Sequence, residues 1–269
     1  MTPAIDVNAY LARIGHAGAV RPTLETLREL VPLHARAIPF ENLNPLLGLP
    51  VLLDAASLER KLVHEGRGGY CFEHNLLLKH VLEAIGFDVH GLAARVLWNQ
   101  PEDALTARGH MLLRVNLEGQ TLLVDVGFGG MTLTGVLRLE PGLEQATPHE
   151  PFRLLESGGD FRMQARVRGE WKTLYRFDLQ EQFQPDYEVT NYYLSTHPRS
   201  HFRTGLVAAR AEADRRYALR NSQLTIHLLG GPSEVRVLTS AAELRESLER
   251  DFLLKLPEDP QLELALARL

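Results

Sequence analysis

The only cysteine of the chain, Cys71, lies in a segment that suits nucleophilic chemistry. It follows two glycines and a tyrosine, and apolar residues at helical spacing from Leu78 to Ile85, ended by Gly86, predict a helix that begins near the thiol. The positive end of a helix dipole can lower the pKa of a thiol from about 8.5 into a range of roughly 3.5 to 7.5. A small buried apolar residue is the alternative interpretation of a lone cysteine. The surrounding glycines and the helix start favour a reactive thiolate.

A nucleophilic cysteine needs a base and a third group that orients the base. His110 begins a strand-like segment rich in apolar and β-branched residues, and Asp125 ends the next such segment. A carboxylate flanked by Val124 and Val126 must be desolvated, so it requires a cationic or donor partner. The residues therefore predict a triad in which Cys71 is the nucleophile, His110 the base and Asp125 the orienting carboxylate.

The register of the hairpin between these two strands decides whether the pair can meet. If Glu118–Gly119 form a two-residue loop, Leu117 pairs with Gln120, and His110 lies diagonally across from Asp125 on the same face. A three-residue loop would shift the register by one residue and separate the two side chains, unless a bulge restored the alternation.

These segments resemble those of the arylamine N-acetyltransferases. The order and spacing of the cysteine, histidine and aspartate segments agree with that family, and the resemblance covers nearly the whole chain. The matching stretches are Arg67–Asn75, Gly109–His110, Val124–Gly130, Ile38–Leu43, Asn191–Tyr193 and His197–Phe202.

The resemblance implies both a fold and a reaction. The fold is α+β, with an N-terminal helical bundle, a central antiparallel β-barrel-like domain, a C-terminal α/β lid and a thiol-protease-like catalytic core. The reaction is acetyl transfer from acetyl-CoA to aromatic amines and hydrazines by a ping-pong mechanism through acetylated Cys71. Acetyl-CoA is then a cosubstrate, and no tightly bound cofactor is expected.

The resemblance also implies binding residues around the triad. It assigns Phe128 and Phe202 as walls for an aromatic amine, with Tyr70 nearby, although core packing is an equally open interpretation of Tyr70. Gly127 and Gly129, in the turn after the aspartate, are assigned to the coenzyme.

Stabilisation of the tetrahedral oxyanion requires preorganised donors. The backbone amide of Cys71, at the start of a helix, is one expected donor. Asn75 is either the second donor or a packing or capping residue.

The chain divides into three expected parts: a helical domain carrying the nucleophile (1–86), a β domain carrying the histidine and aspartate (87–199) and an α/β lid (200–269). Helix starts are predicted after Asp6, Thr23 and Asp54 in the first part. The second part is predicted as mainly short strands, with turns at Gly119, Gly158–Gly159 and Gly169–Glu170. The third mixes strands at 224–227 and 235–238 with a final helix whose Ser240 and Glu243 have capping-box spacing.

The composition limits partners and compartment. The chain has 269 residues, 45% of them hydrophobic, which is enough for more than one domain. A net charge of -5 without a basic block argues against nucleic acid and against an anionic membrane surface. The sequence contains no transmembrane-length apolar run, the start Met1–Asp6 lacks the regions of a secretory signal, and a single cysteine suits a reducing cytoplasm.

Other local patterns carry weaker predictions. Arginines within 197–203 and 210–220 could attract coenzyme phosphates, but a solvated mixed-charge face is the favoured interpretation. Pro198 breaks the helix that would align His197 with His201, so no metal site is expected. Gly127–Gly130 lacks the third glycine of a dinucleotide loop.

Two alternative functions remain open. A thiol hydrolase or transglutaminase-like amide-transfer enzyme would employ the same triad, and a non-catalytic binding protein would retain only the fold. The oligomeric state is not predicted.

Overall fold

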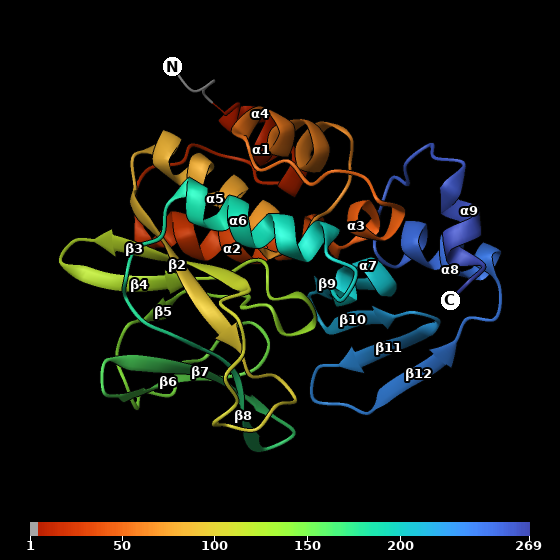
Figure 1. The fold of residues 1–269 in the computed structure, drawn as a ribbon. Coiled ribbons are helices and arrows are strands. Elements are labelled where there is room, and N and C mark those ends of the chain that lie inside the picture. The colour runs from red at the N-terminus through yellow and green to blue at the C-terminus, as the bar shows by residue number, and fades with distance from the viewer. Residues whose placement is uncertain (1–4) are drawn as a thin grey trace.

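The structure is a computed structural model that describes residues 5–269. The first four residues, on which the expected lack of a secretory signal partly depends, lie outside the described residues. The chain folds into a layer of helices and two antiparallel sheets (Figure 1).

The elements follow one another along the chain. The helical elements are α1 (Val7–Ile14), α2 (Leu24–Ala37), α3 (Leu43–Leu47), α4 (Ala55–Leu58), the π-helix η1 (Glu59–His64), α5 (Cys71–Ile85), the 3₁₀-helix η2 (Gly129–Met131), α6 (Gln184–Thr196), α7 (His201–Thr204), α8 (Ala241–Arg250) and α9 (Gln261–Leu266). The strands are β1 (Phe40–Glu41), β2 (Asp88–Val96), β3 (His110–Leu117), β4 (Gln120–Val124), β5 (Leu137–Arg138), β6 (Phe152–Ser157), β7 (Asp160–Val167), β8 (Glu170–Phe177), β9 (Val207–Glu212), β10 (Arg215–Arg220), β11 (Gln223–Leu228) and β12 (Ser233–Val237).

The predicted helix starts in the first part are confirmed. The side chains of Asp6, Thr23 and Asp54 each accept a hydrogen bond from a backbone amide in the first turn of α1, α2 and α4, respectively. None of the described helices is long and apolar enough to cross a membrane.

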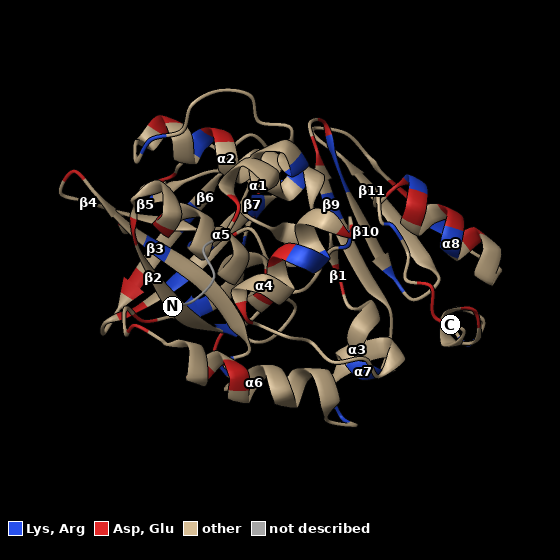
Figure 2. Ribbon diagram, turned by 90° about the horizontal axis from the view of Figure 1, so that it is seen from above, with Lys and Arg blue, Asp and Glu red and all other residues tan. Residues whose placement is uncertain are grey.

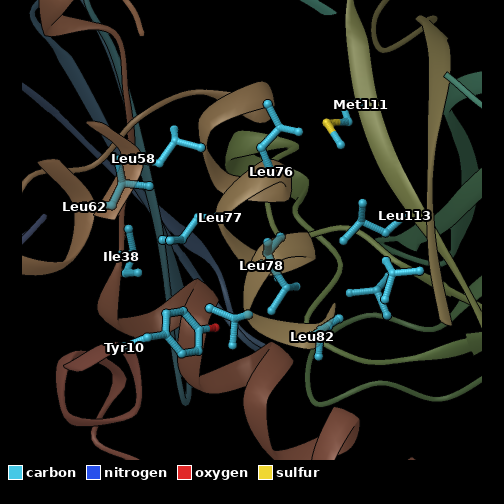
Figure 3. Packing of buried hydrophobic residues seen from close by; sticks show 14 of the residues in the cluster. Tyr10, Ile38, Leu58, Leu62, Leu76, Leu77, Leu78, Leu82, Met111 and Leu113 are labelled. Atoms are coloured by element: carbon cyan, nitrogen blue, oxygen red, sulfur yellow. The ribbon is translucent and has the colours of Figure 1, made fainter. Parts of the chain in front are cut away.

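Helix α5 is the centre of the helical layer and is buried on all sides along most of its length. Leu77 faces Ile38 at the end of α2, while Leu76 lies on the side of Met111 in β3 (Figure 3). Each fully buried leucine contributes about 1.5–3 kcal/mol relative to an exposed one. Contacts on both sides therefore fix α5, and with it the position of Cys71.

A series of hydrogen bonds between buried polar side chains connects α5 to α2 and α1. Tyr10 Oη lies 2.9 Å from His34 Nδ1, His34 Nε2 lies 2.9 Å from His74 Nδ1, and His74 Nε2 lies 3.1 Å from the Pro39 carbonyl oxygen. Because that carbonyl only accepts, His74 donates through Nε2, His34 donates to His74, and Tyr10 donates to His34. Both histidines are neutral in this arrangement. Burial lowers the pKa of His74 to about 4 and holds that of His34 well below its usual value.

The central sheet has the strand order β5-β4-β3-β2-β8-β7-β6 and curls into a barrel-like shape. The segment after β5 brings the two edges together, because Pro141 bridges Leu154 and Gln145 bridges Phe152. Apolar side chains, including Leu112, fill the interior. The expected α+β fold with an antiparallel barrel-like domain is confirmed.

The hairpin turns agree closely with the predictions. Leu117 pairs with Gln120 across Glu118–Gly119, and Ser157 pairs with Asp160 across Gly158–Gly159. The third turn lies one residue earlier than predicted, at Arg168–Gly169, because Glu170 already pairs with Val167.

The C-terminal sheet has the order β1-β9-β10-β11-β12, and α8 and α9 share an apolar core with it. Ser240 caps α8 as predicted, since its side chain accepts from the Glu243 amide. The helix α9 was not predicted. Strand β1 comes from the N-terminal part, since Phe40 pairs with Ala209 of β9.

The expectation of mainly short strands between residues 87 and 199 is wrong for the segment that forms α6. Its buried positions are Tyr187, Asn191 and Ser195, while Val189 and Tyr192 are exposed. Two of the three buried residues are polar, so the segment has no apolar stripe at helical spacing from which a helix could be predicted. Helix α6 contacts the start of α5 through the Tyr187 ring, which packs against the Phe72 ring with centroids 5.7 Å apart.

Candidate active site

Cys71 is the first residue of α5 and is buried. The Glu73 carboxylate accepts a hydrogen bond from the Tyr70 amide at 3.0 Å, which closes the helix start. Only glycine fits at the two positions before Tyr70, Gly68 and Gly69. A Cβ atom on Gly68 would overlap the Pro39 carbonyl, and one on Gly69 would lie 2.6 Å from the Glu73 carboxylate.

The hairpin that carries His110 and Asp125 has the predicted two-residue loop. Glu118 and Gly119 have φ values of 50° and 77°, the left-handed pair of a type I′ turn. The resulting register places both side chains on the barrel side of the sheet. His110 Nε2 lies 2.7 Å from Asp125 Oδ2.

Asp125 is buried, and its carboxylate oxygens meet four donors. Oδ2 contacts His110 and accepts from the Tyr175 hydroxyl at 2.9 Å. Oδ1 accepts from Asn75 Nδ2 at 3.1 Å and from the Gly127 amide at 3.0 Å. Burial alone would raise the pKa of Asp125, but the charge of His110 and these hydrogen bonds lower it below its usual value.

His110 lies between the carboxylate and the thiol. Burial alone would lower the pKa of His110, but the charge of Asp125 and hydrogen bonds with Asp125 and Cys71 raise it to about 10. Because Nε2 faces Asp125, Nδ1 is the ring nitrogen that remains for Cys71. The thiol also donates to the Gly109 carbonyl oxygen at 3.7 Å. The structure therefore brings the three predicted side chains together in the predicted order.

Asn75 is a structural clamp in this arrangement. Its Nδ2 donates to the Met111 carbonyl at 2.8 Å as well as to Asp125, and its Oδ1 accepts from the Val126 amide at 3.2 Å. Both amide hydrogens are therefore used, and none is free for an oxyanion. Of the two interpretations left open by the sequence, the structure supports packing.

Tyr175 was not predicted as a site residue. It lies on β8 in the barrel interior and donates to the same carboxylate oxygen that contacts His110. Tyr175 lies in an apolar strand segment, and a buried tyrosine usually needs a hydrogen-bond partner for its hydroxyl. The sequence offers no other sign that Tyr175 contacts Asp125.

The thiol and the imidazole open into a cavity of about 1430 Å³ between the barrel and the C-terminal sheet. Phe128, Phe202, Gly127 and Gly129 line it, as expected for residues near a substrate. Tyr70 does not, because it is fully buried behind the cavity wall.

Two aromatic rings form walls of the cavity near the thiol. The Phe128 ring packs edge-on against His110, with ring centroids 5.0 Å apart. The Phe202 ring packs against Phe40 at 6.2 Å and against Tyr70 at 5.3 Å. One ring therefore contacts the imidazole, and the other comes from the C-terminal part.

Close packing against the start of α5 requires a glycine at position 127. A Cβ atom there would lie 2.7 Å from Cys71 Cα and 2.8 Å from Asn75 Nδ2. The missing side chain therefore lets the end of the aspartate strand lie directly on the start of α5.

Most arginines of 210–220 are engaged within the protein. Arg210 and Arg216 are buried and paired with Glu212 and Glu150. Arg220 lines the cavity and forms no ion pair within residues 5–269. Charges elsewhere are interspersed, as on α8, where acidic and basic residues alternate (Figure 2). Within the same range, no cluster of histidine, cysteine and acidic residues could hold a metal ion.

Comparisons with known proteins identify the family of the chain. Residues 23–260 match the N-acetyltransferase family. The arylamine N-acetyltransferase of Mycolicibacterium smegmatis is 49% identical over 253 residues, covering 93% of this chain and 92% of the relative. That of Escherichia coli is 43% identical over 253 residues, covering 94% and 89%. The solved structure of Mycobacterium marinum arylamine N-acetyltransferase in complex with CoA superposes with a TM-score of 0.93 at 45% identity, covering 98% of this chain and 99% of that one.

Proposed function

Because the chain belongs to the arylamine N-acetyltransferase family and is an acyltransferase with acetyl-CoA as its cosubstrate, we propose that Cys71 carries the acetyl group between two half-reactions. The observation that supports this proposal most directly is the buried contact between His110 and Asp125 beside the thiol, with His110 Nε2 and Asp125 Oδ2 2.7 Å apart. The acceptors are aromatic amines and hydrazines.

The first half-reaction acetylates the thiol. Because the charge of Asp125 raises the pKa of His110 to about 10, the imidazole is a base strong enough to take the proton of Cys71 and hold it during the attack. The thiolate attacks the thioester carbonyl of acetyl-CoA. The carbon–sulfur bond to CoA then breaks, His110 gives its proton to the departing sulfur, and acetyl-Cys71 and CoA remain.

The second half-reaction transfers the acetyl group to nitrogen. The amine attacks the carbonyl carbon of acetyl-Cys71, and His110, now neutral, takes the proton that the nitrogen loses. The bond to Sγ breaks and the thiolate is restored beside the imidazolium. Asp125 holds the ring in one orientation throughout and stabilises its charged form.

The oxyanion of each tetrahedral intermediate needs a donor close to Sγ. Cys71 is the first residue of α5, so its backbone amide has no partner within the helix. We assign this amide as one oxyanion donor.

The cavity supports the assignment of substrates. Its volume of about 1430 Å³ exceeds the roughly 300–1,000 Å³ of an ordinary small-molecule site, as a site shared by a coenzyme arm and an amine requires. We assign Phe128 and Phe202 to the aromatic amine, and Gly127 and Gly129 to the coenzyme side. Arg220 supplies positive charge for phosphates.

We also keep the division into 1–86, 87–199 and 200–269 as three parts that meet at this cavity. The single cysteine suits a reducing compartment, so we place the enzyme in the cytoplasm, with a role in the metabolism of foreign aromatic amines.

Mass measurement of a single peptide tests the proposal. The protein is incubated with acetyl-CoA and digested with trypsin, and the peptide containing Cys71 is weighed. We expect one added acetyl group, lost again when an aromatic amine is added, and neither acetylation nor turnover in Cys71→Ala. Turnover by Cys71→Ala, or a wild-type peptide without the acetyl group, would refute the nucleophile assignment.

A further inference from the structure

We propose that Tyr70 and Asn191 act as a positioning pair that holds the Phe202 ring in place and thereby sets the preference for ring-bearing amine acceptors. This inference rests on the proposed function, because it concerns the second half-reaction of the same site. Neither residue of the pair lines the cavity.

Tyr70 stands directly behind the cavity wall. Its side chain is fully buried, and its ring packs edge-on against Phe202 at 5.3 Å and against Phe72 at 5.8 Å. Burial raises the pKa of Tyr70 above its usual value, so the phenol keeps its proton and remains a donor. The ring of Tyr70 is therefore a fixed support for the ring of Phe202.

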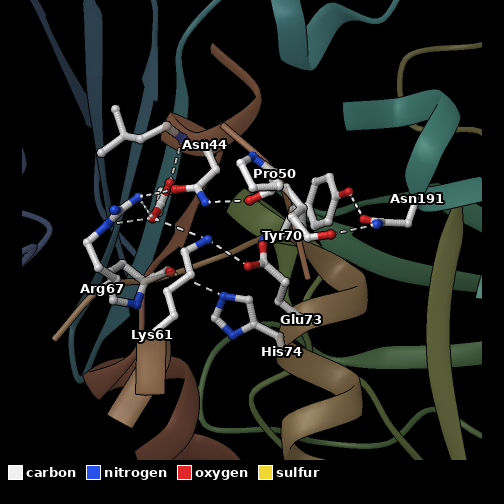
Figure 4. A network of polar contacts seen from close by, with 12 residues as sticks. Asn44, Pro50, Lys61, Arg67, Tyr70, Glu73, His74 and Asn191 are labelled. Atoms are coloured by element: carbon white, nitrogen blue, oxygen red, sulfur yellow. Dashed lines mark hydrogen bonds and ion pairs between the residues drawn. The ribbon is translucent and has the colours of Figure 1, made fainter. Parts of the chain in front are cut away.

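Asn191 holds the far end of this support. The Tyr70 hydroxyl donates to Asn191 Oδ1, and Asn191 Nδ2 donates to the Val51 carbonyl at 2.9 Å (Figure 4). Asn191 is itself buried in α6, and its backbone carbonyl accepts from Ser195 Oγ, one turn later, at 2.8 Å. The position of the Tyr70 ring is thus tied to a helix far from the thiol in sequence.

The backbone of Phe202 is held separately from its ring. Asn42 Nδ2 donates to the Phe202 carbonyl at 2.8 Å and to the Gly205 carbonyl at 2.7 Å, and its Oδ1 accepts from the Val207 amide at 2.7 Å. These bonds fix the main chain of α7 and leave the ring direction to its neighbours. The ring is held by packing alone, so a shift of Tyr70 changes the cavity wall directly.

Removal of the Tyr70 hydroxyl disturbs the position of the Tyr70 ring, which supports Phe202, but keeps the ring itself. The variant Tyr70→Phe leaves Asn191 Oδ1 without its buried donor, and an unmatched buried acceptor favours rearrangement around it. An aromatic amine depends on the wall for binding, whereas hydrazine has no ring to place there. The two acceptors therefore distinguish a change in the wall from a change in the triad.

The test measures transfer from pre-acetylated enzyme to each acceptor in single turnovers. For Tyr70→Phe we expect the ratio of kcat/KM for an aromatic amine to kcat/KM for hydrazine to fall about fivefold, the central value for one hydrogen bond. The matched control is Tyr187→Phe. This phenol is also buried, packs against Phe72 at 5.7 Å and donates to the Leu92 carbonyl, but has no ring contact with Phe202, so its ratio should stay within about twofold.

A second variant shows whether the two residues act as one unit. Asn191→Ala should lower the same ratio, and the double variant should lower it no further than the larger single effect, because both remove one interaction. An unchanged ratio in folded Tyr70→Phe, equal losses with both acceptors, or independent multiplicative losses in the double variant would overturn the inference. If Tyr70→Phe does not fold, an unchanged ratio in Asn191→Ala alone overturns it. Failure of wild-type Cys71 to become acetylated would instead overturn the proposed function.

Discussion

Replacement of Gly127 by alanine should impair catalysis through packing. The added Cβ would lie 2.7 Å from Cys71 Cα, 3.0 Å from the Cys71 carbonyl oxygen and 2.8 Å from Asn75 Nδ2. Two of these atoms belong to the backbone at the start of α5 and cannot move by a change of rotamer. Normal contact at about 3.4–4 Å would require the end of the aspartate strand and the helix start to separate by roughly 1 Å.

The magnitude follows from that separation. Overpacking of this kind costs about 1–3 kcal/mol of folding free energy, which lowers Tm by roughly 2–4 °C for each kcal/mol in a chain of this size. The same displacement moves Cys71 relative to His110, and a misplacement of about 1 Å costs on the order of 100-fold in rate. We therefore expect acetylation of Cys71 to slow about 100-fold.

Rapid-quench mass measurement of acetyl-Cys71, at several concentrations of acetyl-CoA, checks this prediction. Gly130→Ala is the matched control, because a Cβ there would meet only Ala218 Cβ at 3.8 Å, an ordinary contact, while the position lines the same cavity. Its rate should stay within about threefold of wild type. A Gly127→Ala enzyme with wild-type Tm and maximal rate, weakened only in its KM for acetyl-CoA, would show that Gly127 acts on the coenzyme and that the packing argument is wrong.

Two further outcomes are expected. The variant Tyr175→Phe removes one hydrogen-bond donor to the Asp125 carboxylate. A hydrogen bond to a charged group is worth about 1.5–3 kcal/mol, so we expect kcat/KM to fall roughly 10-fold to 150-fold. A loss below threefold would show that the hydroxyl is dispensable. Acid should destabilise the fold through His34 and His74. Their pKa values in the folded protein lie below the value of about 6.5 in the unfolded chain. As the pH falls below about 6.5, the unfolded chain therefore binds more protons than the folded protein, and the free energy of unfolding decreases. Urea unfolding at pH 7 and pH 5 should show a loss of about 2 kcal/mol from His74 and a further loss in the same direction from His34. His74→Gln, which keeps a donor and an acceptor, should remove its own share of that loss, and an unchanged loss in this variant would contradict the assignment.

Local rules predicted most of the geometry that brings Cys71, His110 and Asp125 together. The glycine pair before Cys71 and the apolar spacing after it predicted a helix start, and one of the two hairpin registers left open by the sequence, the two-residue loop, placed His110 and Asp125 on one face. Each of these inferences involves neighbours within a few residues or one tight turn. The structure agrees with all of them because a helix start and a two-residue loop depend little on the rest of the fold.

The remaining contacts depend on long-range packing. Tyr175 reaches Asp125 only because β8 pairs with β2, and the β7–β8 ladder shifts register between Met163 and Gln164. Neither the pairing nor the shift has a local signature. The resemblance placed Tyr70 near the substrate, with core packing as an equally open interpretation, and the structure supports core packing because the side chain is fully buried behind the cavity.

The pairing of Phe40 with Ala209 has a consequence for biosynthesis. Cys71, His110 and Asp125 all belong to the first half of the chain, but β1 stays without its partner strand until β9 (Val207–Glu212) has also left the ribosome. Throughout that interval Cys71 is without the part of the cavity wall that Phe202 forms. The cavity beside Cys71 is thus completed only after the first strands of the C-terminal sheet have been synthesised.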